Sequence, residues 1–223
     1  MPKTKSPQPV AADEIDMDSV MDVIVTRKRE FAIGAVVVVV LVGGVLLWRL
    51  SSNQKNERAL AALADATNTL YSGNRPLGET QLQAVADRYR DTAPGIEAAM
   101  VLAQTDFEEA RWPDGLKVLD GIKGSGAIDN FKAAIDGLTA GGYADMKKYD
   151  DAVKSYQAAA DESKYQSVKD LYLADAARVL QVAGKNDDAK KIWEEIASRP
   201  DSPSVAEAKV RLGELSAAPA GKN

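Results

Sequence analysis

The sequence has no cysteine and no histidine among its 223 residues. Without cysteine, no disulfide can stabilise the fold and no thiol is available for chemistry. The lack of both residue types also removes most metal sites, the Ser-His and Cys-His nucleophile systems and the commonest general base. We therefore expect a protein that is not an enzyme and that holds no cofactor and no metal ion.

The sequence also has no excess of positive charge. The chain has 28 Lys and Arg against 33 Asp and Glu, which gives a formal net charge of −5. Nucleic-acid binding needs clustered positive charge, so nucleic acid is not an expected partner. Hydrophobic residues make up 45% of the chain, which is too many for a disordered protein and enough for one domain with a real core.

One long apolar run stands near the N terminus. No charged side chain lies between Phe31 and Trp48, and a basic cluster at 27–29 precedes the run directly. As a helix this run would extend about 27 Å, close to the hydrocarbon thickness of a bilayer. The alternative is a buried core strand, but strands of this length are rare and the run contains no turn signal. The sequence therefore predicts a transmembrane helix over residues 31–50 and the lipid bilayer as a partner.

Specific side chains are expected to hold this span in the membrane. A Trp at its end is a typical interfacial anchor, the following Arg can extend its charge to the headgroups, and the glycines allow another helix to approach closely. The expected anchor residues are Phe31, Gly34, Gly43, Gly44, Trp48 and Arg49.

The span is predicted to be a permanent anchor rather than a cleaved signal. Thirty residues precede it, and no small-x-small cleavage site ends it. Five Lys and Arg residues lie before the span, three of them at 27–29, against Arg49, Lys55 and Arg58 soon after it. This asymmetry favours a cytoplasmic N terminus and an extracytoplasmic bulk.

The two ends of the chain carry weaker signals. Residues 1–12 are rich in proline and small polar residues and are predicted to be a disordered tail. Residues 13–30 have one apolar side and are predicted to form a short cytoplasmic helix, either a docking helix or a lead-in to the span. Residues 217–223 are predicted to be a frayed tail.

A period of 37 residues runs through the remaining region, 51–216. Each unit repeats a small residue, a second small residue twelve positions later, and a large apolar residue four positions after that. The recurring positions are Ala103, Gly115 and Leu119, then Ala140, Ala152 and Tyr156, then Ala177, Ala189 and Trp193. Such spacing predicts stacked units of two antiparallel helices, in which the small residues allow close approach and the large one fills the space between units.

The predicted fold is therefore all-α, with one N-terminal transmembrane helix followed by an α-solenoid of helix pairs. Turn residues set the ends of its helices, among them Gly124 and Gly126, the Gln166-Ser167 pair, and Pro200. Beyond the span, the predicted helices cover residues 53–71, 79–89, 96–110, 114–122, 132–147, 150–162, 169–183, 187–198 and 204–216.

The repeat pattern resembles the tetratricopeptide repeat. The likeness is clearest in the second unit, which has Ala140, Tyr143, Tyr149, Ala152 and Tyr156 at the family's positions. The period of 37 exceeds the family's usual length of about 34, which places the extra residues in the connections.

The order of segments is similar to that of the ancillary SecYEG translocon subunit family. An acidic tail, a basic cluster, one span, an alanine-rich helix and divergent repeats follow one another, and a half unit at 211–215 ends the array. The resemblance implies a single-pass protein of the bacterial inner membrane with a periplasmic repeat domain. It also implies protein partners, namely translocon components and periplasmic chaperones or client chains.

Stacked helix pairs curve and present their first helices on the concave side. By the family's pattern, the lining of this groove would be Met100, Gln104, Phe107, Glu108, Gly141, Ala144, Asp145, Arg178 and Gln181. The set is mixed and weakly charged, which favours recognition of unfolded or helical segments through apolar contact. The alternative is that the chain's own terminal helix fills part of the groove.

Two functions are consistent with these features. The first is a non-catalytic, membrane-anchored scaffold for protein–protein interaction, associated with the Sec translocon and with periplasmic chaperones or emerging chains. The second is an accessory or assembly subunit of another membrane complex, held mainly through its transmembrane helix.

Overall fold

The computed structural model describes residues 52–217 of the chain. The predicted disordered tail, cytoplasmic helix and membrane span, together with residues 218–223, lie outside this range. Within residues 52–217 the regular elements are all helical and no strand is present, so this part is all-α as predicted. None of the helices in this range is both long and apolar enough to cross a membrane.

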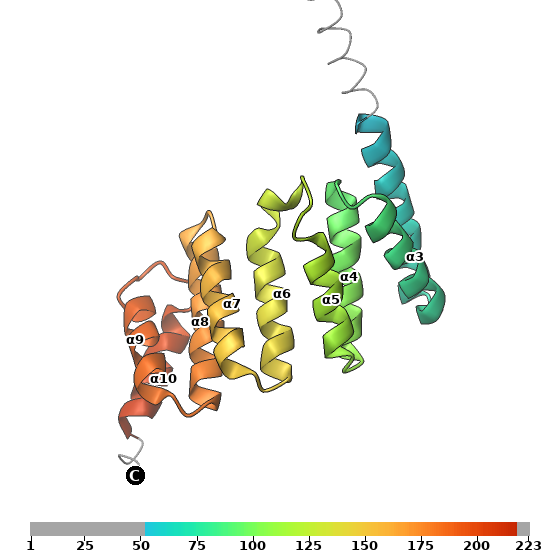
Figure 1. The fold of residues 1–223 in the computed structure, drawn as a ribbon. Coiled ribbons are helices and arrows are strands. Elements are labelled where there is room, and N and C mark those ends of the chain that lie inside the picture. The colour runs from blue at the N-terminus through green and yellow to red at the C-terminus, as the bar shows by residue number, and fades with distance from the viewer. Residues whose placement is uncertain (1–51, 218–223) are drawn as a thin grey trace, which may run out of the picture. The chain divides into compact units, whose positions relative to one another are not determined.

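The helices follow one another with short connections (Figure 1). A first helix covers residues 52–71. The next elements are α3 (Arg75–Arg88), α4 (Ala93–Glu108), α5 (Trp112–Ile122), a 3-10 turn η1 (Ile128–Asn130), α6 (Lys132–Asp145), α7 (Tyr149–Glu162), α8 (Gln166–Val182), α9 (Asn186–Ala197) and α10 (Val205–Ala217). We call the helix over 52–71, α4, α6, α8 and α10 the first helices, and α3, α5, α7 and α9 the second helices.

The predicted helices are all present, with ends that differ by a few residues. Both α3 and α4 begin earlier than predicted because Pro76 and Pro94 lie in their first turns, where proline is tolerated, instead of in a connection. The Gln166-Ser167 pair, predicted as a connection, forms the first turn of α8. The predicted connection at Gly124 and Gly126 is confirmed.

The same tight turn joins the first helix to the second helix in four successive pairs. Its last residue has a positive φ in each case, at Gly73 (100°), Ala110 (60°), Lys147 (60°) and Gly184 (75°). These positions are 37 residues apart (110 − 73 = 147 − 110 = 184 − 147 = 37). Backbone hydrogen bonds recur at the same interval, such as Lys148 N to Tyr143 O at 2.9 Å. The period found in the sequence is therefore a period of the backbone.

The turn at Gly73 belongs to a repeat unit that the sequence analysis did not recognise. The three equivalent positions of this unit are Ala66, Gly78 and Leu82, each 37 residues before its counterpart, and all three are buried. The array therefore begins with the helix over 52–71 and α3, one unit earlier than the sequence predicted.

The small residues let the two helices of a pair touch, as predicted. A Cβ atom added to Gly115 would lie 2.8 Å from the carbonyl oxygen of Ala103, and one added to Gly78 would lie 2.5 Å from the Cα of Leu70. Contacts of this length exclude any side chain. Of the three large residues, Leu119 and Trp193 are fully buried as expected, whereas Tyr156 is only partly buried.

Two glycines of α6 receive aromatic rings from the neighbouring first helices. A Cβ on Gly142 would lie 2.8 Å from Cζ of Phe107 in α4, and one on Gly137 would lie 2.5 Å from Cε1 of Tyr172 in α8. The buried apolar residues form one core cluster up to Ile135 and a second from Ala160 onward. Helix α6 lies at this junction, and its glycines allow both neighbours to pack closely.

Candidate functional site

An apolar groove of about 710 Å³ runs along the first helices. Its walls come from the helix over 52–71, α4, the start of α6 and one residue of α8. The lining residues are Leu60, Leu63, Ala64, Thr67, Glu97, Met100, Val101, Gln104, Phe131, Ala134, Gly137, Leu138 and Tyr172. This volume lies within the range of pockets that bind small molecules.

The groove is built from equivalent positions of consecutive repeats. Leu63, Met100 and Gly137 are 37 residues apart, and Leu60, Glu97 and Ala134 show the same interval. Each first helix therefore presents the same stripe of its surface, as stacked units require.

A helix cap and the burial of leucine side chains determine how the walls of the groove are placed. The Thr92 hydroxyl accepts a hydrogen bond from Gly95 N at 3.3 Å and thereby caps the start of α4, which places Glu97 about one turn into the helix. Leu63 is 8% exposed and belongs to the core, whereas Leu60, one turn earlier, is 58% exposed at the rim. The groove is therefore continuous with the core below and open to solvent above.

Tyr172 forms one end of the groove. Its ring lies against the bare backbone of Gly137, so a side chain at that position would displace it. Burial raises the pKa of the Tyr172 phenol, and the nearby carboxylates of Asp175 and Asp136 raise it further. The phenol is therefore neutral throughout the physiological range and offers the groove an uncharged polar group.

Charge is sparse in the groove and dense beyond it. Glu97 is the one charged side chain among the lining residues in the described part of the chain. One repeat beyond the groove, Arg178 of α8 binds Glu207 of α10, with Nε donating to Oε1 at 2.8 Å, and also pairs with Asp175. The hydrogen bonds from Arg178 lower the pKa of Glu207, although burial opposes this. The apolar surface thus ends where the ion pairs of the terminal helix begin.

The structure brings only two of the predicted groove residues, Met100 and Gln104, into the lining. Phe107 is not available, because its ring is wedged between Gly115 and Gly142. Glu108 pairs with Arg75 at 2.8 Å and lines a smaller neighbouring cavity of about 230 Å³.

The remaining predicted residues lie outside the apolar groove. Gly141, Ala144 and Asp145 are on the last turns of α6, and none of them is a lining residue. Arg178 is held by the terminal helix, which agrees with the alternative that this helix occupies part of the predicted surface. The Gln181 side chain accepts a hydrogen bond from Nε1 of the buried Trp193 at 3.0 Å, so it supports the core.

One whole wall of the groove is absent from the residues predicted from the sequence. Leu60, Leu63, Ala64 and Thr67 belong to the unrecognised first unit. Their signal was available, because Ala66 stands 37 residues before Ala103. The lining of this cavity also lies about one turn closer to the start of each first helix than the residues expected from the family's pattern.

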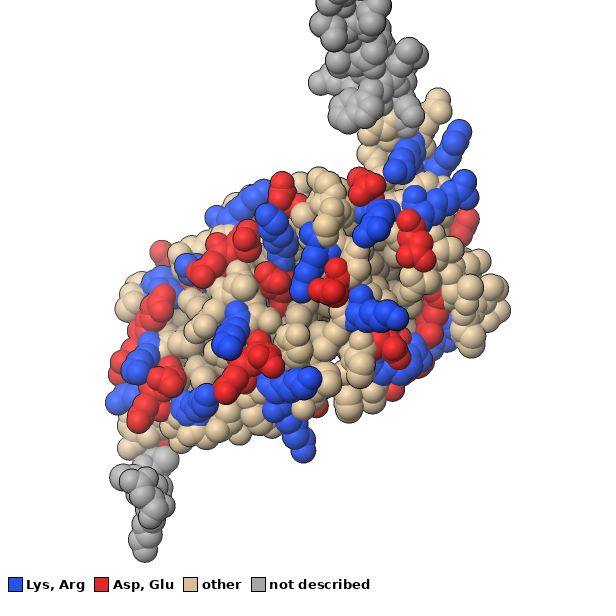
Figure 2. Space-filling model, in the orientation of Figure 1, with Lys and Arg blue, Asp and Glu red and all other residues tan. Residues whose placement is uncertain are grey.

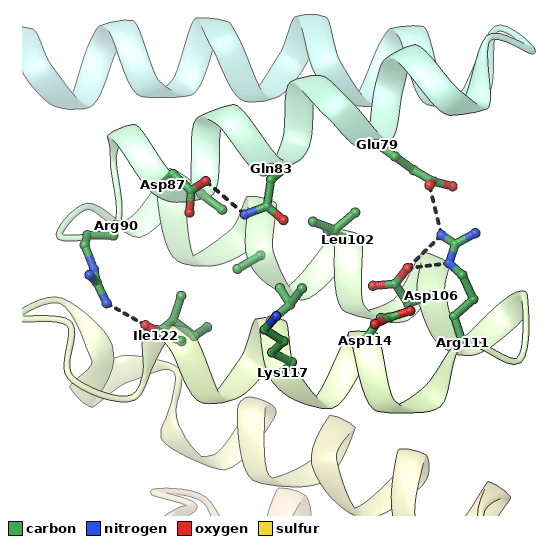
Figure 3. A pocket seen from close by; sticks show the side chains of 14 residues that line it. Glu79, Gln83, Asp87, Arg90, Leu102, Asp106, Arg111, Asp114, Lys117 and Ile122 are labelled. Atoms are coloured by element: carbon green, nitrogen blue, oxygen red, sulfur yellow. Dashed lines mark hydrogen bonds and ion pairs between the residues drawn. The ribbon is translucent and has the colours of Figure 1, made fainter.

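A second cleft, of about 740 Å³, lies between α3 and α5, and side chains of α4 form its base (Figure 3). Arg111 donates from Nη2 to Asp106 Oδ1 at 2.6 Å and to Glu79 Oε2 at 2.9 Å, and Arg90 donates to the carbonyl of Gly121 at 2.5 Å. Burial raises the pKa of Asp106 despite the opposing effect of Arg111. Most of the charge in this cleft is therefore satisfied within the protein.

A similar cleft of about 510 Å³ lies two repeats later, between α7 and α9. There Lys185 pairs with Asp150 at 2.6 Å and Lys191 pairs with Asp188 at 2.9 Å. Because the charged side chains of both clefts are mostly paired within the protein, we interpret the clefts as valleys between adjacent second helices and not as a dedicated ligand site. The visible face of the molecule mixes both signs of charge (Figure 2). Within residues 52–217 no three carboxylates gather as a metal site.

Comparison with known proteins gives no family. No family model, no curated protein and no solved structure matches this chain. The resemblance to tetratricopeptide repeats and to the translocon subunit family therefore stays a prediction from the sequence, and the groove is interpreted from its own chemistry.

Proposed function

We propose that this protein is a non-catalytic, membrane-anchored module for protein–protein interaction and that the apolar groove is its binding face. The observation that carries the proposal is an open groove of about 710 Å³ with a single charged lining residue. Soluble surfaces rarely leave a continuous apolar patch uncovered unless a partner covers it.

The finer fold assignment is part of this proposal. Four turns with positive φ at intervals of 37 residues support an α-solenoid of the tetratricopeptide type. In such solenoids each unit contacts its neighbours, and the first helices together form an extended binding surface.

The sequence supports a site near the membrane. Only nine residues separate the predicted span, which ends at residue 50, from Leu60 at the rim of the groove. Even a fully extended chain would place Leu60 within roughly 35 Å of the end of the span. The groove would therefore act on protein segments close to the bilayer.

The specific form of the proposal follows the family resemblance. The protein would lie in the bacterial inner membrane with a cytoplasmic N terminus and a periplasmic repeat domain. It would associate with the Sec translocon and with periplasmic chaperones or emerging chains. The alternative, an accessory subunit of another complex held through its transmembrane helix, has the glycines of the span in its favour.

Site-specific photocrosslinking in cells separates these functions. A photoreactive residue would replace Gln104 in the groove, Val38 in the span, or Ala84 on the exposed side of α3 as a control. We expect Gln104 to capture a translocon component, a chaperone or a nascent chain, and Ala84 to capture none of them. Capture from Val38 alone would favour the accessory-subunit function and would contradict the groove proposal.

A further inference from the structure

We propose that the groove binds an amphipathic α-helix of another protein, with a basic residue beside the apolar stripe of that helix. This inference rests on the proposed function and specifies the conformation and charge of the partner. The inference rests on three properties of the groove: the hydrogen-bond partners available to a bound backbone, the exposure of its rim, and the position of Glu97, its one charged lining residue.

The walls offer few partners to the backbone of a bound peptide, chiefly the Tyr172 phenol and the Gln104 side-chain amide. The walls are helices whose own N–H and C=O groups are bonded within the helix. Among the polar lining groups, the Thr67 hydroxyl already donates to the carbonyl oxygen of Leu63 at 2.9 Å. An extended peptide would bury backbone amides for which the walls hold too few partners, and each unsatisfied amide would weaken binding. A helix avoids this cost because its backbone bonds are internal.

The exposure of the groove requires a polar side on the bound helix. Leu60 at the rim is 58% exposed, so the groove covers one side of an occupant and leaves the other in water. An occupant with apolar residues at positions i, i+3, i+4 and i+7 matches this half-open geometry. Met100 in the floor is unbranched and can adapt to different apolar side chains.

Glu97 gives the groove its charge preference. It is exposed, and no ion pair to it is formed within residues 52–217. The groove adds no positive side chain of its own. A Lys or Arg at the edge of the bound helix would therefore meet an available carboxylate, whereas an acidic residue there would be repelled.

Binding of two isomeric peptides tests the conformation of the partner. The full-length protein in neutral phosphatidylcholine nanodiscs, without detergent, would be titrated against two fluorescein-labelled peptides of 18 Leu and Lys residues. One peptide has leucine at helical spacing, and the other has the same composition with leucine at every second position. Fluorescence anisotropy with empty nanodiscs as the blank removes binding to lipid. We expect the helical pattern to bind at least about tenfold more tightly.

Point variants test the location and the charge. Leu60→Asp should weaken binding of the helical peptide about tenfold, and Leu77→Asp should leave it unchanged, because Leu77 is similarly exposed (46%) outside the groove. Glu97→Gln should weaken binding about two- to fivefold at low salt and have less effect at high salt. Glu162→Gln at the end of α7, which is also exposed and lies outside the groove, is the matched charge control.

The outcomes separate the inference from the proposed function. If the alternating peptide binds as tightly as the helical one and Leu60→Asp weakens it, the helix inference is wrong and the groove proposal stands. If neither peptide binds above the blank, or Leu60→Asp changes nothing, both fail. Self-association of the full-length protein that Leu60→Asp abolishes would assign the groove to a second copy and would overturn the inference.

Discussion

Replacement of Ala110 by glycine should stabilise the protein. Ala110 ends the turn between α4 and α5 with φ of 60°, where the Cβ of an L-residue crowds the carbonyl oxygen at a cost of about 1–2 kcal/mol. Glycine removes this strain, but it loses about 0.5–1 kcal/mol more conformational entropy on folding. The net change in the free energy of unfolding should be an increase of about 0.5–1 kcal/mol. The equivalent turns already carry glycine at Gly73 and Gly184.

Urea unfolding of the full-length protein in lipid vesicles measures this change. The far-UV circular dichroism of the helices reports unfolding, and tryptophan fluorescence, to which the fully buried Trp193 contributes together with Trp48 and Trp112, is a second probe. With a slope of about 2 kcal/mol per molar urea, the midpoint for Ala110→Gly should rise by roughly 0.25–0.5 M. The control Ala84→Gly makes the same substitution at an exposed position inside α3 and should lower the midpoint. A midpoint that falls in both variants would refute the argument that backbone strain is stored in this turn.

Two further predictions concern packing and pH. Gly142→Ala should destabilise the protein by about 1–3 kcal/mol, because the new methyl group meets the ring of Phe107, and Phe107→Leu should recover part of the loss in the double variant. At Asp170, burial alone would raise the pKa of the carboxyl, but hydrogen bonds from Arg199 and other side chains outweigh it and lower the pKa. Ionised Asp170 therefore stabilises the fold above its unfolded-state pKa of about 4, and this contribution is lost as pH falls through the lower folded-state value. Stability measured from pH 7 down to pH 2 should fall less steeply in Asp170→Asn than in the natural protein; an unchanged pH dependence would contradict this assignment.

The sequence predicts the helices of this protein well because their signal is local and periodic. Small residues at a fixed interval specify where two helices touch, and the same positions are buried in the structure, as at Ala140 and Ala177. The first unit was missed for a local reason. The predicted helices leave a gap over residues 72–78, but Pro76 lies in the first turn of α3, so the connection at Gly73 is as short as those in the later units.

The lining of the groove was harder to predict because it depends on distances between helices. Phe107 has the spacing of a groove residue, yet Gly142, 35 residues later, removes the side chain that would have kept it at the surface. Arg178 also has the correct spacing, but its surface depends on Glu207 of a helix that the repeat pattern does not align. Sequence spacing gives the face of a helix, and only packing decides which residues on that face stay free.

The terminal helix explains why the apolar groove lies toward the N-terminal end of the array. Within the described residues no second helix follows α10. Its repeat positions therefore need no small residues for close approach to such a partner. The position equivalent to Ala177 is the exposed Glu214, and the buried alanine of α10 is Ala208 instead. With the buried position shifted in this way, Glu207 of α10 lies beside Arg178 of α8. The ion pair between them covers this part of the α8 surface. Within residues 52–217 no such ion pairs cover the lining residues of the first unit, so Leu60 remains exposed at the rim of the groove.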